Sequence, residues 1–442
     1  MNRMTNPRNI KSTILSALCL CLLLLTGCSK DDETETLPPE PPQQEQEEEP
    51  EAPQEPAPED EEEPVVMREA HFTDTIVYDR SPLLTNFNFE YPSVDPYGKP
   101  VMLSGTITIG PLVKLGKLST GIVLYNHYTV YHADQCPSRG KLDMPEYLQL
   151  LMPKNAFITV SADYYGFGVT EDKPQAYCIP SANARASVDA LIAARKLMAD
   201  AGYKWADRLF NIGYSQGGQT AIGVLKLVTE QYPDIHITST IAGGGPYDIP
   251  ETYHRMLESD YTDMPSTIIN VLLAYNEFFR LGIKRSDLFK EPLLSHVDDW
   301  ILSKQYKAEE IDNMVGTKAM SDFAAAPILN LESAVSKRLM EVLEKENLCK
   351  GWKPSEDSHV ILIHNADDDT VPVENTDNLY FFLKDSGVSK AIRVKDHWGH
   401  IPGMDTHDSG AIVFIGVACL RVKSIIDLLE KIQEGIDTIT GT

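Results

Sequence analysis

Three residues, Ser215, Asp368 and His400, have the types and the chain order of a nucleophile, an acid and a base. Ser215 lies at the centre of Gly213-Tyr214-Ser215-Gln216-Gly217, which fits the pattern G-x-S-x-G. A serine hydroxyl is a poor nucleophile until a base takes its proton, and a third group must orient that base. The sequence therefore predicts nucleophilic catalysis by Ser215, with His400 as general base and Asp368 as the orienting acid.

The residues around Ser215 strengthen this prediction. A β-rich run precedes it at 209–212, and residues 220–222 begin a helical pattern. A strand that turns sharply into a helix holds its central serine in a strained conformation, and only small residues two positions away leave room for the turn. Gly213 and Gly217 meet this need. The backbone N–H of Gln216 would then point toward a developing oxyanion.

Asp368 is the preferred acid among three consecutive aspartates that follow the β-rich run 360–364. It precedes Val371-Pro372 by three residues, a spacing seen in many hydrolases with this serine motif. Asp367 and Asp369 are the alternatives. A solvated acidic turn or a cation site would also explain the cluster, although the D-x-D-x-D-G spacing is absent.

His400 is the preferred base because Gly399 and Gly403 give it a loop in which an imidazole could reach Ser215. His397 and His407 are the competing histidines. A second oxyanion donor is expected from the loop after the run 121–126. There the N–H of Tyr128 is the candidate, with Thr129 behind it.

Short β-rich runs alternate with helical stretches through the body of the chain, which predicts the α/β class with a mostly parallel sheet. Helices are expected at 181–201, 216–230 and 410–433, each packing one apolar face on the sheet. Eight strands are expected, at 71–78, 101–109, 121–126, 157–162, 209–214, 237–242, 360–364 and 391–395.

Only helical patterns appear between about 248 and 354, the clearest at 266–281. A helical insertion between two strands of a parallel sheet would lie over their carboxyl ends, where the sites of such sheets form. This segment is therefore expected to be a cap. Its apolar helix could line a substrate pocket, or it could pack the cap onto the sheet.

The run 213–218 (GYSQGG), together with 162–168 (ADYYGFG), resembles the secretory lipase family over roughly 121–403. The resemblance implies the α/β-hydrolase fold with helices on both faces of an eight-stranded sheet and a helical cap. It also implies hydrolysis of carboxylic esters through an acyl-enzyme, without a cofactor. No CxxC or HExxH spacing in the sequence indicates a metal site. The sequence departs from the family at Tyr128, where the family has glycine.

Other functions stay open at this point. A serine peptidase of the prolyl-oligopeptidase superfamily would use the same residues, but no N-terminal propeller precedes the motif. An esterase that deacetylates glycans is equally compatible. A lipoprotein that has this fold but only binds at the cell surface is the alternative from outside the enzymes.

The N-terminal 28 residues have the basic start and short apolar core of a signal peptide, too short to span a bilayer. Residues 25–28 (LTGC) resemble the lipobox of bacterial lipoproteins, which implies cleavage before Cys28 and lipid attachment there. Residues 29–33 resemble a signal for export to the outer membrane and cell surface. Residues 29–64 contain 16 acids and one lysine, and we expect a disordered tether.

The chain carries a net charge of −26 and no basic run, which argues against nucleic acid as a partner. The expected partners are a small-molecule or lipid ester as substrate and a membrane reached through the lipid anchor. Outside the cytoplasm, the four cysteines of the body could pair. Cys136 with Cys178 is the preferred pairing, and free buried thiols are the alternative.

Overall fold

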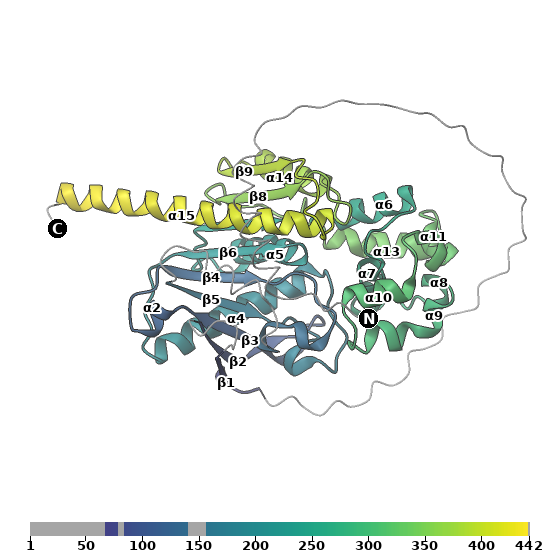
Figure 1. Ribbon diagram of the computed structural model, residues 1–442, viewed down its shortest axis with the longest axis horizontal. Helices are drawn as coiled ribbons and strands as arrows, with labels where there is room; N and C mark the ends of the chain where they lie inside the picture. Colours follow the sequence, from purple (N-terminus) through teal and green to yellow (C-terminus); the bar gives the residue numbers. More distant parts are fainter. Residues whose placement is uncertain (1–66, 78–83, 140–155, 441–442) are drawn as a thin grey trace, which may run out of the picture. The chain divides into compact units, whose positions relative to one another are not determined.

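The computed structural model describes residues 67–77, 84–139 and 156–440 of the chain, and these form one body. The signal peptide, the lipobox with Cys28 and the acidic segment 29–64 lie outside the described residues. Within the body, one sheet runs through the centre and helices cover both of its faces (Figure 1).

The sheet has nine strands in the order β1-β2-β3-β5-β4-β6-β7-β8-β9. The first three strands pair antiparallel, β3 also pairs antiparallel with β5, and the remaining pairs are parallel. The strands are β1 (His71–Val77), β2 (Thr85–Val94), β3 (Pro100–Ile109), β4 (Gly121–Asn126), β5 (Phe157–Ala162), β6 (Leu209–Tyr214), β7 (Ser239–Gly243), β8 (Val360–Asn365) and β9 (Ala391–Asp396).

The prediction of eight strands was wrong by one strand, β2. Its sequence contains two asparagines and Pro92, which lower strand propensity and remove a donor. The register explains why the proline is tolerated: β1 pairs with β2 only as far as Glu90, so beyond that residue β2 has β3 alone as neighbour. A proline on such an unpaired edge need not break a ladder.

One face of the sheet is covered by α4 (Pro180–Asp200), α5 (Gln216–Gln231) and α14 (Glu374–Asp385), and the other by α15 (Thr406–Thr440). Side chains along each strand point alternately to the two faces of the sheet, so each face has its own hydrophobic core. On β8, Val360 and Leu362 pack with the helices of the first face, whereas Ile361 and Ile363 pack with α15. The three helices predicted from apolar periodicity are confirmed, and α15 begins four residues earlier than expected.

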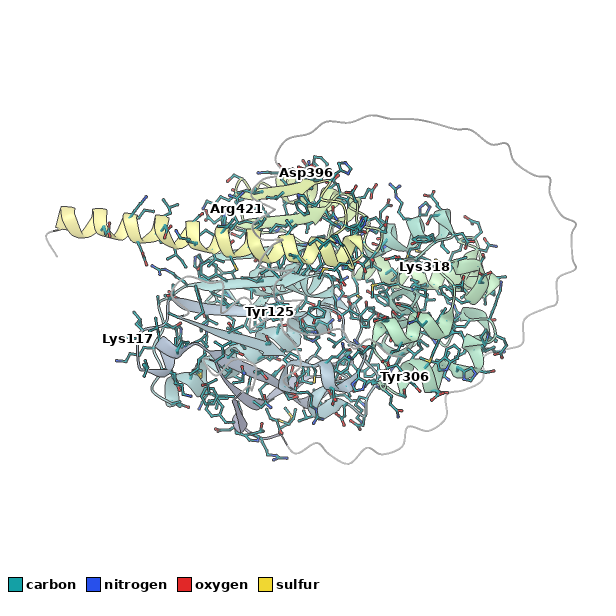
Figure 2. The ribbon with its side chains drawn as sticks, in the orientation of Figure 1. Lys117, Tyr125, Tyr306, Lys318, Asp396 and Arg421 are labelled. Atoms are coloured by element: carbon teal, nitrogen blue, oxygen red, sulfur yellow. The ribbon has the colours of Figure 1, made fainter. Side chains whose placement is uncertain are left out.

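Between β7 and β8 the described chain contains helices and no strand of the sheet. Figure 1 shows them gathered beside one end of the sheet, and in Figure 2 Lys318 lies among them while Lys117 lies at the opposite end. They are α6 (Ile249–Ser259), α7 (Pro265–Phe278), α8 (Arg285–Leu288), α9 (Leu293–His296), the π-helical turn η5 (Val297–Leu302), α10 (Ala308–Val315), α11 (Met320–Phe323), α12 (Ala326–Leu329) and α13 (Ala334–Lys345).

The four cysteines of the body are free thiols, so the preferred pairing of Cys136 with Cys178 was wrong. Both are buried, but in different surroundings. Cys136 packs with Val130 and Phe167, whereas Cys178 belongs to the main core beside α4.

Candidate active site

Ser215 occupies the turn between β6 and α5, as the sequence predicted. Its backbone has φ +57° and ψ −127°, a conformation that costs a residue with a side chain on the order of 1–3 kcal/mol. The surrounding sheet holds this strain in place, because the Ser215 N–H donates to the Gly243 carbonyl of β7 at 2.9 Å. The strain thus presents the hydroxyl at the carboxyl end of the sheet.

Glycine is required on both sides of this turn. A Cβ at Gly213 would overlap the carbonyl of Gly217, and a Cβ at Gly217 would overlap the carbonyl of Asn126 at the end of β4. Both obstacles are backbone atoms, which cannot move aside cheaply. The spacing of the two glycines in the motif therefore reflects close backbone approach in the folded chain.

His407 is the histidine that contacts Ser215. Its Nε2 lies 2.9 Å from the Ser215 Oγ, and its Nδ1 lies 2.6 Å from the Asp368 Oδ2. A carboxylate only accepts, so Nδ1–H donates to Asp368 and the serine hydroxyl donates to Nε2. Three side chains from distant segments thereby form one hydrogen-bonded chain.

The prediction that His400 reaches Ser215 was wrong. His400 is exposed, in the segment between β9 and α15. In that segment Gly399 and Gly403 have φ +61° and φ +87°, and they turn the chain so that α15 begins at Thr406. The imidazole at Ser215 therefore comes from the first turn of a helix and not from the glycine-flanked loop. His397, the other competitor, is exposed and bonds to Asp367.

Asp368 is the carboxylate bonded to His407, in agreement with the preferred position among the three aspartates. Its Oδ1 accepts from the backbone N–H groups of Thr370 at 3.0 Å and Val371 at 2.8 Å. The spacing to Val371-Pro372 thus places the two amides around the carboxylate. The neighbouring aspartates face elsewhere: Asp367 accepts from His397, and Asp369 lies beside Thr406.

Electrostatics keep this pair in the forms that base catalysis requires. Burial raises the pKa of Asp368, but His407 and hydrogen bonds from His364 and His407 outweigh it, so the net pKa falls below the ordinary value. Burial lowers the pKa of His407, but the Asp368 carboxylate outweighs that effect and raises it overall, with help from Asp408 and Asp405. The carboxylate is therefore ionised when the imidazole becomes neutral.

Tyr214, the residue before the serine, also holds His407. Its hydroxyl donates to the His407 carbonyl at 2.7 Å, and the two rings lie 5.0 Å apart. A Cβ at Gly244 would meet the Tyr214 ring at 2.7 Å, so that glycine leaves room for the ring. The variable residue before the serine in the G-x-S-x-G pattern, Tyr214, thus connects the serine turn to the start of α15. The motif itself does not reveal this role.

The two candidate oxyanion donors come from two segments, the start of α5 and the loop after β4. Gln216 is the first residue of α5, and N–H groups in the first turn of a helix have no carbonyl partner within it. Tyr128 follows β4, and its carbonyl accepts from the buried His127 Nδ1 at 2.7 Å. The His127 ring also stacks on Tyr164 with centroids 4.0 Å apart, so it braces the loop that carries Tyr128.

A narrow pocket of about 50 Å³ opens beside Ser215. Helices α6 and α7 of the insertion supply apolar side chains to its wall, among them Ile249, Tyr253, Met256, Ile268 and Val271. Cys178, Gln216 and Val371 also line the pocket. The apolar face of α7 thus does two things, since other residues of the same helix, such as Leu272 and Tyr275, are buried in the core.

The sequence matches the secretory lipase family over residues 143–415, more than half of the chain. The chain belongs to the secretory lipase family. As a member, it is a secreted hydrolase of the lipase and esterase type. A comparison with curated proteins gave no match.

Solved structures similar to this secretory lipase confirm the α/β-hydrolase fold. A hydrolase from Legionella pneumophila matches with a TM-score of 0.64 at 20% identity, covering 79% of this chain and 88% of its own. The rice cell wall degrading esterase LipA from Xanthomonas oryzae matches with a TM-score of 0.66 at 16% identity, covering 81% and 97%. The closed state of Candida antarctica lipase A matches with a TM-score of 0.56 at 15% identity, covering 82% of each chain.

In the segment 162–168, the Asp163 carboxylate accepts from the Ser104 hydroxyl of β3 at 2.5 Å and from the Ser138 N–H at 2.8 Å. This aspartate therefore joins β3 to the chain at Ser138, and these hydrogen bonds are not to Ser215. Among the described residues, no helix combines the length and apolar character needed to cross a membrane.

Proposed function

We propose that this secretory lipase hydrolyses carboxylic esters through an acyl-enzyme on Ser215, with His407 as general base and Asp368 as its orienting carboxylate. The observation that carries the proposal is the continuous chain of hydrogen bonds from Ser215 Oγ through His407 to Asp368, at 2.9 and 2.6 Å. These are the distances that proton transfer from a serine to a histidine requires.

The proposed reaction has two halves. His407 Nε2 takes the Ser215 proton while Oγ attacks the ester carbonyl, and the N–H groups of Gln216 and Tyr128 bind the resulting oxyanion. The C–O bond to the alcohol then breaks, and His407 gives its proton to the leaving alkoxide. Water, deprotonated by His407, attacks the acyl-enzyme in the same way and releases the carboxylic acid and free Ser215.

The pocket supports an acyl chain of limited length. Its apolar wall would bury methylene groups, each contributing about 0.8 kcal/mol, but its volume of about 50 Å³ leaves little room beyond the serine. Met256, Ile268 and Val271 form part of this narrow wall. We therefore infer that short acyl chains are preferred over long ones.

A panel of p-nitrophenyl esters from acetyl to palmitoyl tests the proposal. We expect hydrolysis with kcat/KM highest for the short esters and at least about tenfold lower for palmitoyl, since one methylene in such a pocket changes binding by about 1–3 kcal/mol. A peptide panel run in parallel separates the alternatives: cleavage of peptides with inert esters would favour the peptidase and refute the proposal.

The pH profile of kcat/KM is expected to rise through the pKa of His407. The base must be neutral to accept the serine proton, and the raised pKa of His407 extends its protonated form to higher pH. The acid limb should therefore lie above the ordinary histidine value of about 6.5. Initial rates between pH 5 and 9 measure it, and a limb well below 6.5 would contradict the assignment of His407.

We further propose that Cys28 carries a lipid that anchors the secreted chain to the outer membrane at the cell surface. The support is the run 25–28 (LTGC) that follows the short apolar core of the leader. The mass of the N-terminal peptide of the mature protein tests this, and a free amine on any residue other than Cys28 would refute it.

A further inference from the structure

A second histidine, His364, contacts the same carboxylate oxygen as His407. It is the fifth residue of β8 and is completely buried. Its Nε2 lies 3.2 Å from the Asp368 Oδ2 and 3.0 Å from the Val371 carbonyl oxygen. Both partners are acceptors, so Nε2 must carry a hydrogen and donate to them.

Thr376 determines the state of the other ring nitrogen. The Thr376 Oγ1 lies 2.7 Å from the His364 Nδ1, and Thr376 is itself completely buried at the start of α14. In a neutral imidazole with hydrogen on Nε2, Nδ1 is an acceptor, so the threonine hydroxyl donates to it. The three contacts together fix the orientation of the His364 ring and place a hydrogen on Nε2.

The carboxylate is consequently held by four donors. Oδ1 accepts from the N–H groups of Thr370 and Val371, and Oδ2 accepts from His407 at 2.6 Å and from His364 at 3.2 Å. Two donors on each oxygen leave the group no freedom to rotate. They also divide the negative charge of Oδ2 between two imidazoles.

We propose that His364 is a positioning residue for the reaction: it fixes the Asp368 oxygen that orients His407 and shares its negative charge. The proposal rests on the catalytic roles proposed above for Ser215, His407 and Asp368. The series of hydrogen bonds that supports the reaction then extends from the Ser215 hydroxyl to the Thr376 hydroxyl. It includes two histidines with different roles. His407 moves the proton, and His364 holds the carboxylate still.

Sharing the charge has a consequence for the base. An acceptor that receives two hydrogen bonds stabilises each donor less than if it received one. Without His364, more of the Oδ2 charge would act on His407 and would favour its imidazolium. Removing His364 should therefore make His407 harder to deprotonate and should also let the Asp368 side chain move.

Three substitutions separate positioning from simple packing. His364→Phe keeps an aromatic ring and removes both nitrogens, and we expect kcat/KM to fall about 10- to 100-fold, the usual cost of losing such a supporting partner, with KM nearly unchanged. His364→Gln retains an N–H donor near the position of Nε2, so activity should return to within about threefold of wild type. Thr376→Val removes only the hydroxyl, and its effect should be smaller and in the same direction.

The decisive readout is the acid limb of kcat/KM, measured together with the proton NMR titration of the His407 Nδ1–H. The groups that face His407 are Asp368, Asp405, Asp408 and the Tyr214 ring, and none of these residues is replaced in the variants. We expect both measurements to move to higher pH in His364→Phe and to return toward wild type in His364→Gln. His254→Gln, on the half-exposed part of α6, is the matched histidine control.

Two results would overturn the proposal. One is a folded His364→Phe protein with a wild-type acid limb and kcat/KM. The other is equal loss of activity in the Phe and Gln variants with an unmoved limb, which is the signature of packing. If the Phe variant does not fold, Thr376→Val decides by whether the limb moves. The NMR titration needs no turnover, so it tests His364 even if the wild type proves inert toward every ester and the proposed function fails.

Discussion

His407→Ala is expected to lower kcat on the best ester by up to about 10⁶-fold, whereas His400→Ala should stay within about twofold of wild type. The difference follows from geometry: His407 Nε2 is 2.9 Å from the Ser215 Oγ, while His400 is exposed in the preceding segment. Without an imidazole at the hydroxyl, Ser215 keeps its proton and attacks poorly. Steady-state kinetics on purified variants measures both effects.

The two histidines control for each other, because they lie only seven residues apart in the sequence. A general disturbance of the region between β9 and α15 would lower the activity of both alanine variants to a similar extent. Equal losses in the two variants, or a larger loss in His400→Ala, would contradict the assignment. Circular dichroism and thermal unfolding of each variant confirm that both remain folded.

Ser215→Ala is expected to abolish turnover to the same extent, about 10⁶-fold in kcat, because no acyl-enzyme can form. The remaining rate should still exceed that of water, since the oxyanion donors and the pocket are intact. A fluorophosphonate should add to wild-type Ser215 and to no residue of the alanine variant, as measured by intact mass and peptide mapping. Ser389→Ala, an exposed serine after α14, is the control.

A serine that could be replaced without loss of ester hydrolysis would end the proposal, whatever the geometry of the site. Labelling of wild type at a different residue would do the same. Unchanged KM in a residually active alanine variant would be consistent with the pocket binding the acyl chain independently of the nucleophile.

The positions of Ser215 and Asp368 in the hydrogen-bonded chain were predictable because much of the constraint on them is local in sequence. Gly213 and Gly217 are required by carbonyls that would overlap a Cβ, so the constraint leaves a visible spacing. Asp368 is similar, since the amides of Thr370 and Val371 that bind it lie two and three residues further on. The Gly213 and Asp368 contacts join residues within a few positions, so they leave a pattern in the sequence, whereas the contact of Gly217 with Asn126 is long-range and is visible only as a glycine in the motif.

The histidine beside Ser215 was not predictable in this way, because the position of a histidine depends on where the chain turns back. Glycine neighbours favoured His400, on the idea that a flexible loop brings an imidazole to the serine. The structure instead uses those glycines to end the loop, and a helix packed on the sheet carries His407. An aspartate on each side of the helix start, Asp405 and Asp408, was the available signal, because acids favour the first turn of a helix.

Strand β2 and the contact of His364 were missed for related reasons. The polar residues and proline of β2 argue against a strand unless its partners are known, and only the register with β1 shows that Pro92 lies on an unpaired edge. His364 lies within an apolar run that reads as a buried strand, and its role depends on Thr376 and Asp368 folding back onto it.

The position of His407 at the start of α15 makes the hydrogen-bonded chain at Ser215 depend on a helix that follows every strand of the sheet. The apolar side of that helix, including Phe414, Ala418 and Val422, packs on the sheet and so holds His407 beside Ser215. A molecule whose sheet has formed but whose α15 has not docked has the serine turn without the imidazole. On the proposed mechanism, such a molecule would not hydrolyse esters until this helix is in place.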